Sequence, residues 1–179
     1  MDFTFDDAHH FGLLAVGSPG RSLKGSTLAG GVTLFKIDFE SLSYSRHLGM
    51  INTDNHPARL GKQVRFYTEE LKTHLFVSAP SYTPSKKLSV STEQGMLYVF
   101  NNILQHVLDS ETDFHLTTDD ANSSFTTDER TCRHGDTLAV KRNLLVVGSP
   151  LCMNGKMRNS GRVYVLDAGD TLKSVYSPF

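Results

Sequence analysis

The chain has 179 residues, which is near the size of one ordinary domain. Hydrophobic residues make up 39% of it, and 18 basic side chains stand against 19 acidic ones. This composition argues against a disordered chain and against one that binds a polyanion over its whole surface. Any anion-binding role must therefore be local.

Segments typical of membrane insertion or export are also missing from the sequence. No apolar stretch approaches the roughly 20 residues that span a bilayer. The N-terminal stretch MDFTFDDAHHFG is acidic and has no apolar run behind a basic start, so it is not a secretory signal. We expect either a cytoplasmic chain or a part of a longer protein.

Pairs of alternating apolar runs recur three times along the chain. LLAVGSP at 13–19 precedes GGVTLF at 30–35, HLFVSAP at 74–80 precedes GMLYVF at 95–100, and LLVVGSP at 144–150 precedes GRVYVL at 161–166. The alternation predicts strands with one buried face, and the prolines end the first strand of each pair. Because the three copies are in register, we interpret them as an internal repeat.

Further strands are expected on either side of each pair. An upstream strand is predicted around Phe3 and Phe5 in the first copy, at 60–67 in the second and at 134–141 in the third. A more polar run follows each pair, at 41–49, 102–110 and 171–177, as is typical of a solvent-facing outer strand. The sequence thus predicts about eleven strands in units of four.

Four antiparallel strands per unit, with Pro19, Pro80 and Pro150 at intervals of 61 and 70 residues, are typical of β-propeller blades. We therefore expect an all-β partial propeller of about three four-stranded antiparallel blades. Blade 1 would cover 1–50 with its inner strand clipped, blade 2 would cover 51–111 and blade 3 would cover 112–179. Propellers close with four to eight blades, so we expect a fragment whose open edges and faces make it unstable or self-associating.

These motifs resemble the FG-GAP repeat of integrin alpha-chain propellers and of phosphatidylinositol-glycan-specific phospholipase D. The matching positions are Gly61, Ser78, Ala79, Pro80, Gly95, Tyr98 and Phe100 in the second copy, and Gly135, Gly148, Ser149, Pro150, Gly161, Tyr164 and Leu166 in the third. The family's calcium loop is not matched, because the corresponding segments DDAHH, TEELKT and KRN lack clustered oxygen ligands at its spacing. The resemblance is therefore nearer to the C-terminal propeller of the phospholipase D, where calcium-free blades are tolerated.

The resemblance implies a non-catalytic propeller segment of a glycosylphosphatidylinositol-specific phospholipase D. Cleavage of the GPI anchor would belong to a separate zinc-dependent domain, so no cofactor is expected in this chain. The parent protein would be secreted, and the partners would be its remaining blades or catalytic domain and a GPI glycan or anionic lipid headgroup. The alternative is an integrin-alpha-like adhesion or scaffold propeller that binds a protein ligand. Neither reading involves nucleic acid.

Residues that could carry chemistry are scattered along the sequence. DDAHH at 6–10 is the nearest candidate for a metal site, and we interpret it as a solvated hairpin turn. The acids Asp119, Asp120, Asp128 and Glu129 lie in a Ser/Thr/Asn-rich segment, which favours an exposed inter-blade loop over a calcium site. The Gly-Ser-Pro serines lack the strained elbow of a nucleophile. We predict no catalytic residue and no metal site in this chain.

Six basic side chains fall between the second and third strands of the three predicted blades. They are Arg21, Lys24, Lys86, Lys87, Lys156 and Arg158. Because these loops would leave the same face of a propeller, we expect a cationic arc that binds an anion near a membrane surface. The alternative is that polar loops carry these cations for solubility alone.

The two cysteines, Cys132 and Cys152, fall in loops that would emerge on one face of the third blade. A disulfide is therefore permitted, and it would suit the secreted parent that the resemblance implies. Two free thiols are the alternative. The triplet Asn122-Ser123-Ser124 is a candidate glycosylation site in the connection before this blade, although such triplets also occur by chance.

Overall fold

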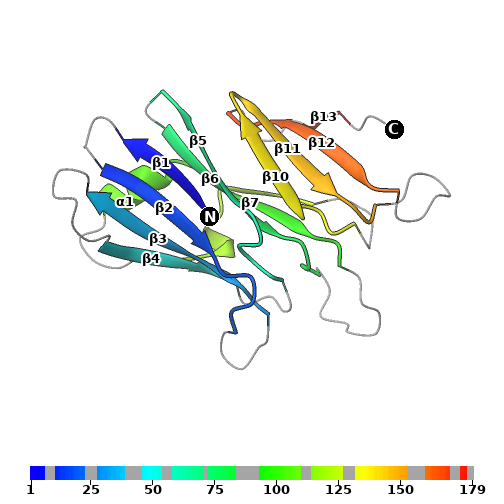
Figure 1. The fold of residues 1–179 in the computed structure, drawn as a ribbon, viewed down its shortest axis with the longest axis horizontal. Coiled ribbons are helices and arrows are strands. Elements are labelled where there is room, and N and C mark those ends of the chain that lie inside the picture. The colour runs from blue at the N-terminus through cyan, green and yellow to red at the C-terminus, as the bar shows by residue number, and fades with distance from the viewer. Residues whose placement is uncertain are drawn as a thin grey trace.

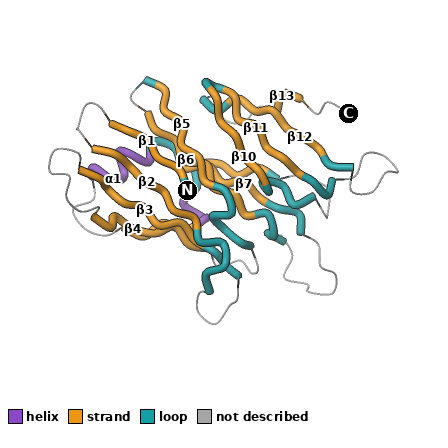
Figure 2. The backbone as a smooth tube through the Cα atoms, in the orientation of Figure 1, coloured by secondary structure: helices purple, strands orange, loops and turns teal. Residues whose placement is uncertain are grey.

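The computed structural model describes residues 1–6, 11–22, 28–38, 46–53, 58–70, 72–83, 93–109, 114–126, 132–152, 160–169 and 174–176. Over these ranges the protein is all-β, with thirteen strands, one short α-helix and one 3-10 turn (Figure 1). The strands form three sheets that lie side by side, and none of these sheets closes on itself (Figure 2).

The sheets follow one another along the chain. The first sheet contains β1 (Asp2–Asp6), β2 (Phe11–Gly17), β3 (Gly31–Asp38) and β4 (Arg46–Asn52), with β8 (Phe114–Thr117) added at its edge. The second sheet contains β5 (Val64–Glu69), β6 (Lys72–Ala79), β7 (Met96–Phe100) and β9 (Ser123–Phe125). The third sheet contains β10 (Thr137–Lys141), β11 (Leu144–Ser149), β12 (Arg162–Asp167) and β13 (Ser174–Tyr176). All pairings are antiparallel except that of β4 with β8.

The alternating runs form the predicted strands, including β1, which contains Phe3 and Phe5. The strand predicted at 102–110 is wrong, because α1 (Ile103–Asp109) occupies this segment. Ile103 and Val107 are buried, while Gln105 and His106 face solvent. An extended chain would place residue 105 on the same face as 103 and 107, whereas a helix turns it away from them.

The polypeptide leaves the second sheet after β7 and returns to it only at β9. Between these strands it forms α1, pairs β8 with β4 of the first sheet, and makes the 3-10 turn η1 (Thr118–Asp120). Gly49 permits the pairing, because a Cβ there would lie 2.1 Å from the Phe114 carbonyl oxygen. The fourth strand of the second sheet therefore comes after residue 111, so the expected boundary between 111 and 112 does not separate the sheets.

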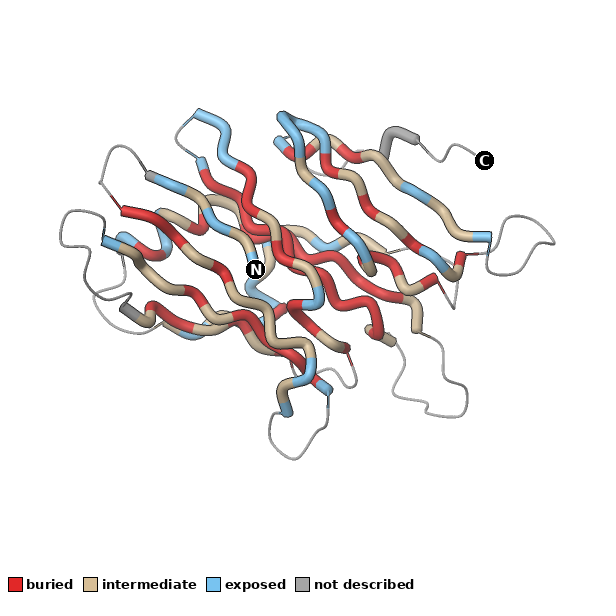
Figure 3. Tube along the Cα trace, in the orientation of Figure 1, coloured by how far each residue is buried: buried red, intermediate tan, exposed pale blue. Residues whose placement is uncertain are grey.

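Two apolar cores hold the three sheets together. One lies between the first and second sheets and includes Leu13, Val32, Leu75 and Ile103. The other lies between the second and third sheets and includes Phe76. The second sheet is consequently buried on both faces, and its strands β6 and β7 form the most buried part of the molecule (Figure 3).

No helix within the described ranges is long and apolar enough to cross a membrane.

Candidate functional site

The same backbone hydrogen bond closes the loop between the second and third strands in all three sheets. The amides of Gly30, Gly95 and Gly161 donate to the carbonyls of Arg21, Tyr82 and Cys152, at 3.0, 3.1 and 3.1 Å. The three glycines have φ angles of +81°, +82° and +75°, a left-handed conformation that side chains with a Cβ rarely adopt. We call the residue pairs joined by these hydrogen bonds the loop necks. The three necks are equivalent, and each lies at the same end of its sheet.

The predicted cationic residues belong to these loops, and the structure describes one of them. Arg21 forms the first neck and is half-buried. Its Nη1 donates to the Met50 sulfur at 2.8 Å, so its guanidinium is turned back toward β4. Lys24, Lys86, Lys87, Lys156 and Arg158 lie outside the described residues.

A second repeated feature is the junction between neighbouring sheets. Gly30 bridges Leu60, and Gly95 bridges His134, in each case just before the first strand of the next sheet. The Leu60 amide donates to the Ala29 carbonyl and the His134 amide to the Gln94 carbonyl, both at 3.0 Å. A Cβ on Gly30 or Gly95 would lie 2.3 or 2.2 Å from backbone atoms of the neighbouring sheet. The glycines of the sequence repeat are therefore the points where adjacent sheets come into backbone contact.

His134 fills the second junction with a buried imidazole. Its Nδ1 shares a hydrogen bond with Ser149 Oγ at 2.8 Å, and its Nε2 is buried without a hydrogen-bond partner. The ring centroid lies 4.9 Å from that of Phe125 and 5.1 Å from that of Tyr164. Burial lowers the pKa of His134 to about 4, so the ring is neutral at physiological pH. No repeated motif marks His134 in the sequence, because its counterpart in the first junction is Leu60.

The structure joins Cys132 and Cys152 in a disulfide beside this histidine. Both cysteines are fully buried, and the Cys152 sulfur lies 3.8 Å from the Tyr164 hydroxyl. The bond connects the segment before β10 to the neck of the third loop. It therefore ties the junction between the second and third sheets to the loop that follows β11.

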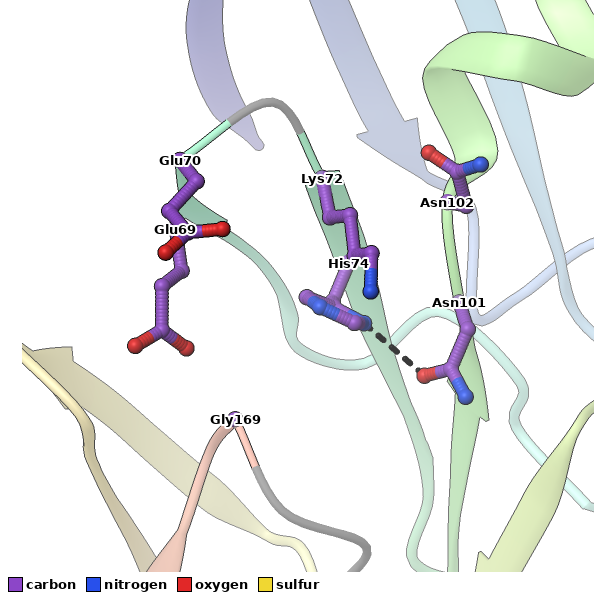
Figure 4. A pocket seen from close by; sticks show the side chains of 7 residues that line it. All are labelled: Glu69, Glu70, Lys72, His74, Asn101, Asn102 and Gly169. Carbon is purple, nitrogen blue, oxygen red and sulfur yellow. Dashed lines mark hydrogen bonds between the residues drawn. The ribbon is translucent and has the colours of Figure 1, made fainter.

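A polar pocket of about 410 Å³ opens at the opposite end of the second sheet (Figure 4). Its lining consists of Glu69, Glu70, Lys72, His74, Asn101, Asn102 and Gly169. The His74 ring is fixed by a 2.8 Å hydrogen bond between its Nδ1 and the Asn101 side-chain oxygen, and it stacks on Tyr67. These groups can donate and accept hydrogen bonds. No sequence pattern indicates this pocket, because its residues come from distant parts of the chain.

The pKa of the Tyr67 hydroxyl, which lies beside this pocket, is raised. Burial is the main cause, and the hydrogen bond to Glu69 adds to it. The turn after β12 lies against the Glu69 carboxylate at Gly169. Tyr67 is therefore a neutral hydrogen-bonding group and not a source of charge.

The acidic segment before the third sheet forms a local cap in its described part. Asp120 Oδ2 accepts hydrogen bonds from the Thr117 amide at 2.7 Å and from the Thr117 hydroxyl at 3.0 Å, and η1 follows. Asp128 and Glu129 lie outside the described residues, as do residues 7–10 of the DDAHH segment. Over the ranges that the structure describes, no three His, Cys, Asp or Glu side chains are grouped as a metal site.

The glycosylation candidate Asn122 is exposed immediately before β9. Its side-chain oxygen accepts a hydrogen bond of 2.6 Å from the Asn101 amide.

Neither a protein-family model nor a curated protein sequence matches this chain.

Proposed function

We propose that this chain is a non-catalytic segment of an FG-GAP-type β-propeller that binds its ligand through the loops after β2, β6 and β11. The repeated junction is the observation that carries the proposal. Gly30 forms a backbone bridge with Leu60, and Gly95 forms the same bridge with His134. Both glycines have a left-handed backbone. Successive sheets related by one repeated contact are what a propeller requires.

The position of the first strands also supports this arrangement. β5 lies beside both β1 and β10, so the first strands of the three sheets are neighbours. Asp2 Oδ2 accepts a hydrogen bond of 2.6 Å from the Phe66 amide, and the Thr4 and Thr68 hydroxyls share one of 3.1 Å. In a propeller the first strand of each blade surrounds the central axis, and these contacts suit that place.

Within this proposal, the three loops carry cations that recruit the parent protein to an anionic headgroup or glycan. The equivalent loop necks support a common direction for the loops. The parent would be a secreted protein resembling glycosylphosphatidylinositol-specific phospholipase D, with catalysis in a separate zinc domain. Near an anionic membrane each Lys or Arg contributes about 1 kcal/mol, so three loop cations together would strengthen binding about 100-fold.

The test compares two triple variants that remove the same charges from opposite ends of the sheets. Lys86→Ser, Lys156→Ser and Arg158→Ser remove loop cations, whereas Lys72→Ser, Lys141→Ser and Arg142→Ser remove exposed cations at the β5–β6 and β10–β11 turns. Binding to vesicles containing phosphatidylinositol and to neutral phosphatidylcholine vesicles is measured by co-sedimentation at low and high salt.

We expect the loop variant to lose about 100-fold in affinity for the anionic vesicles at low salt, and the turn variant to lose much less. Equal losses in both variants would show that only net charge matters. Equal binding of the unchanged chain to both vesicle types would rule out the anion-binding function. Specific binding to a cell-surface protein with no vesicle dependence would favour the adhesion propeller instead.

A further inference from the structure

The triplet Asn122-Ser123-Ser124 is the only Asn-X-Ser/Thr triplet in the sequence, and the proposed binding function does not use it. Such a triplet is the acceptor for asparagine-linked glycosylation, which uses the asparagine amide and the hydroxyl two residues later. The structure places this triplet at the entry to β9. Asn122 and Ser124 are both exposed, whereas Ser123 between them is half-buried. The two residues that the modification uses are therefore the two that face solvent.

The Asn122 side chain is held in an orientation that suits a glycan. Its Oδ1 accepts a hydrogen bond of 2.6 Å from the Asn101 amide, and its own backbone amide donates to the Val99 carbonyl at 2.9 Å. A backbone amide can only donate, so the side-chain atom that faces Asn101 must be the oxygen. The nitrogen Nδ2, to which a sugar would be attached, makes no hydrogen bond to a described residue. The bond to Asn101 can therefore persist in the glycosylated chain.

The disulfide gives independent support for glycosylation. Cys132 and Cys152 are joined, and both are fully buried. Disulfides form and persist in oxidising compartments such as the lumen of the endoplasmic reticulum, where asparagine-linked glycans are also added. The triplet alone could have arisen by chance. An exposed acceptor together with a buried disulfide in one short chain favours passage through the secretory pathway.

The position of Asn122 leaves the proposed binding loops open. Gly95, in the second loop neck, precedes β7, and Asn101 follows the other end of this strand. Six residues of extended chain separate Gly95 from Asn101, which is about 20 Å. Asn122 is bonded to Asn101, so it lies at the end of the sheet that carries the polar pocket (Figure 4). β9 is also the last strand in the hydrogen-bonding order of the second sheet.

We propose that Asn122 carries an asparagine-linked glycan at the outer edge of the second sheet. The co-reactant is a lipid-linked oligosaccharide pyrophosphate. A bond forms between Nδ2 of Asn122 and C1 of the first sugar, and the bond between C1 and the pyrophosphate oxygen breaks. Nδ2 loses one proton and the lipid pyrophosphate leaves, so no oxidant or reductant is needed. The inference shares with the proposed function only the export of the chain, and it does not depend on the ligand of the loops.

The test uses the 179-residue chain expressed in cultured animal cells behind a cleavable secretion signal. Secreted and cell-retained protein are both collected, and thiols are alkylated without reduction. The intact mass then reports the glycan and the disulfide in the same molecule. We expect a mass above the 19.8 kDa of the chain by that of a glycan, with no alkylated thiol. Release by a peptide N-glycosidase in heavy-oxygen water converts a glycosylated asparagine to labelled aspartate, and we expect the label at Asn122 alone.

Three variants test the triplet without disturbing the Asn122 side chain. Ser124→Ala removes the acceptor hydroxyl but keeps Asn122 and its hydrogen bond to Asn101, so it should carry no glycan. Ser124→Thr keeps the hydroxyl and Ser123→Ala keeps the triplet, so both should be glycosylated like the unchanged chain. Neither serine belongs to the two apolar cores, so the disulfide should form in all three variants.

Three results would overturn the proposal. They are an unchanged chain without a glycan in both fractions, a glycan that persists on Ser124→Ala, and a glycan found only on molecules with alkylated thiols. Vesicle binding does not enter the measurement. A glycosylated chain that binds no anionic vesicle would contradict the proposed function and leave the glycan at Asn122 in place.

Discussion

The sharpest test of the sheet junction is the substitution Gly95→Ala. Gly95 has a φ of +82°, and an added Cβ would lie 2.2 Å from the His134 amide nitrogen. The left-handed backbone costs a residue with a Cβ about 1–2 kcal/mol. The collision cannot be relieved by a side-chain rotation, because the opposing atoms are backbone. The sheets must separate, which weakens the amide-to-carbonyl bonds from Arg133 to Glu93 and from His134 to Gln94.

Those two hydrogen bonds contribute about 1 kcal/mol each, and more if the donors stay buried without partners. We therefore expect Gly95→Ala to lower the free energy of unfolding by about 3–5 kcal/mol. That is a large part of the roughly 5–15 kcal/mol that stabilises a typical domain. The measurement is urea unfolding followed by far-ultraviolet circular dichroism at one protein concentration, since the chain has no Trp.

Two glycines provide matched controls for this substitution. Gly161 has a φ of +75° but no neighbour closer than 3.4 Å, so Gly161→Ala should cost only the backbone term of about 1–2 kcal/mol. Gly20 has open space and no positive φ, so Gly20→Ala should change stability by less than about 0.5 kcal/mol. The smaller entropy of an alanine in the unfolded chain is common to all three variants. Equal destabilisation by Gly95→Ala and Gly161→Ala would refute the argument from close sheet contact.

Three other outcomes follow from the buried junction and core. The unfolded chain protonates His134 below about pH 6.5 and the folded chain only near pH 4, so stability should fall by up to about 3 kcal/mol as the pH drops through that window. His134→Leu should remove this slope in pH-dependent urea unfolding, and an unchanged slope would assign it to other groups. Reducing the Cys132–Cys152 bond, which spans 20 residues, should cost about 3 kcal/mol, and two alkylatable thiols in non-reducing peptide mapping of secreted material would contradict the bridge. Phe76→Ala should destabilise the fold by about 3–5 kcal/mol, whereas Leu108→Ala, at a partly exposed site, should cost less than about 1 kcal/mol in the same assay.

The strands of the repeat were predictable because their apolar residues alternate and because Pro and Gly mark their ends. The position of segment 102–110 in the repeat predicts a strand, although Ile103 and Val107 are also spaced as on one face of a helix. β8 and β9 are only four and three residues long, and their strands form through pairing with β4 and β7. An alternation over so few residues is too short to identify a strand from the sequence.

Some features of the candidate site could also be predicted from the sequence, and others could not. The glycines that close the three loops and the positions of the two cysteines could be predicted from the repeat. The polar pocket could not, because Glu69, Asn101 and Gly169 come together only when the second and third sheets are packed. The turning of Arg21 toward Met50 likewise depends on β4 lying beside β3.

The sequence by itself determined the local features: where strands run, where they end, and which glycines recur. Those features depend on residues a few positions apart, through backbone conformation and the alternation of side chains. Only the tertiary structure decided which residues contact each other across the junctions between neighbouring sheets. It buries both faces of β6, leaves Phe3 and Val163 partly exposed, and encloses His134 where the first junction has Leu60. Burial and pKa depend on atoms brought together from distant parts of the chain, so they follow from packing and not from the order of residues alone.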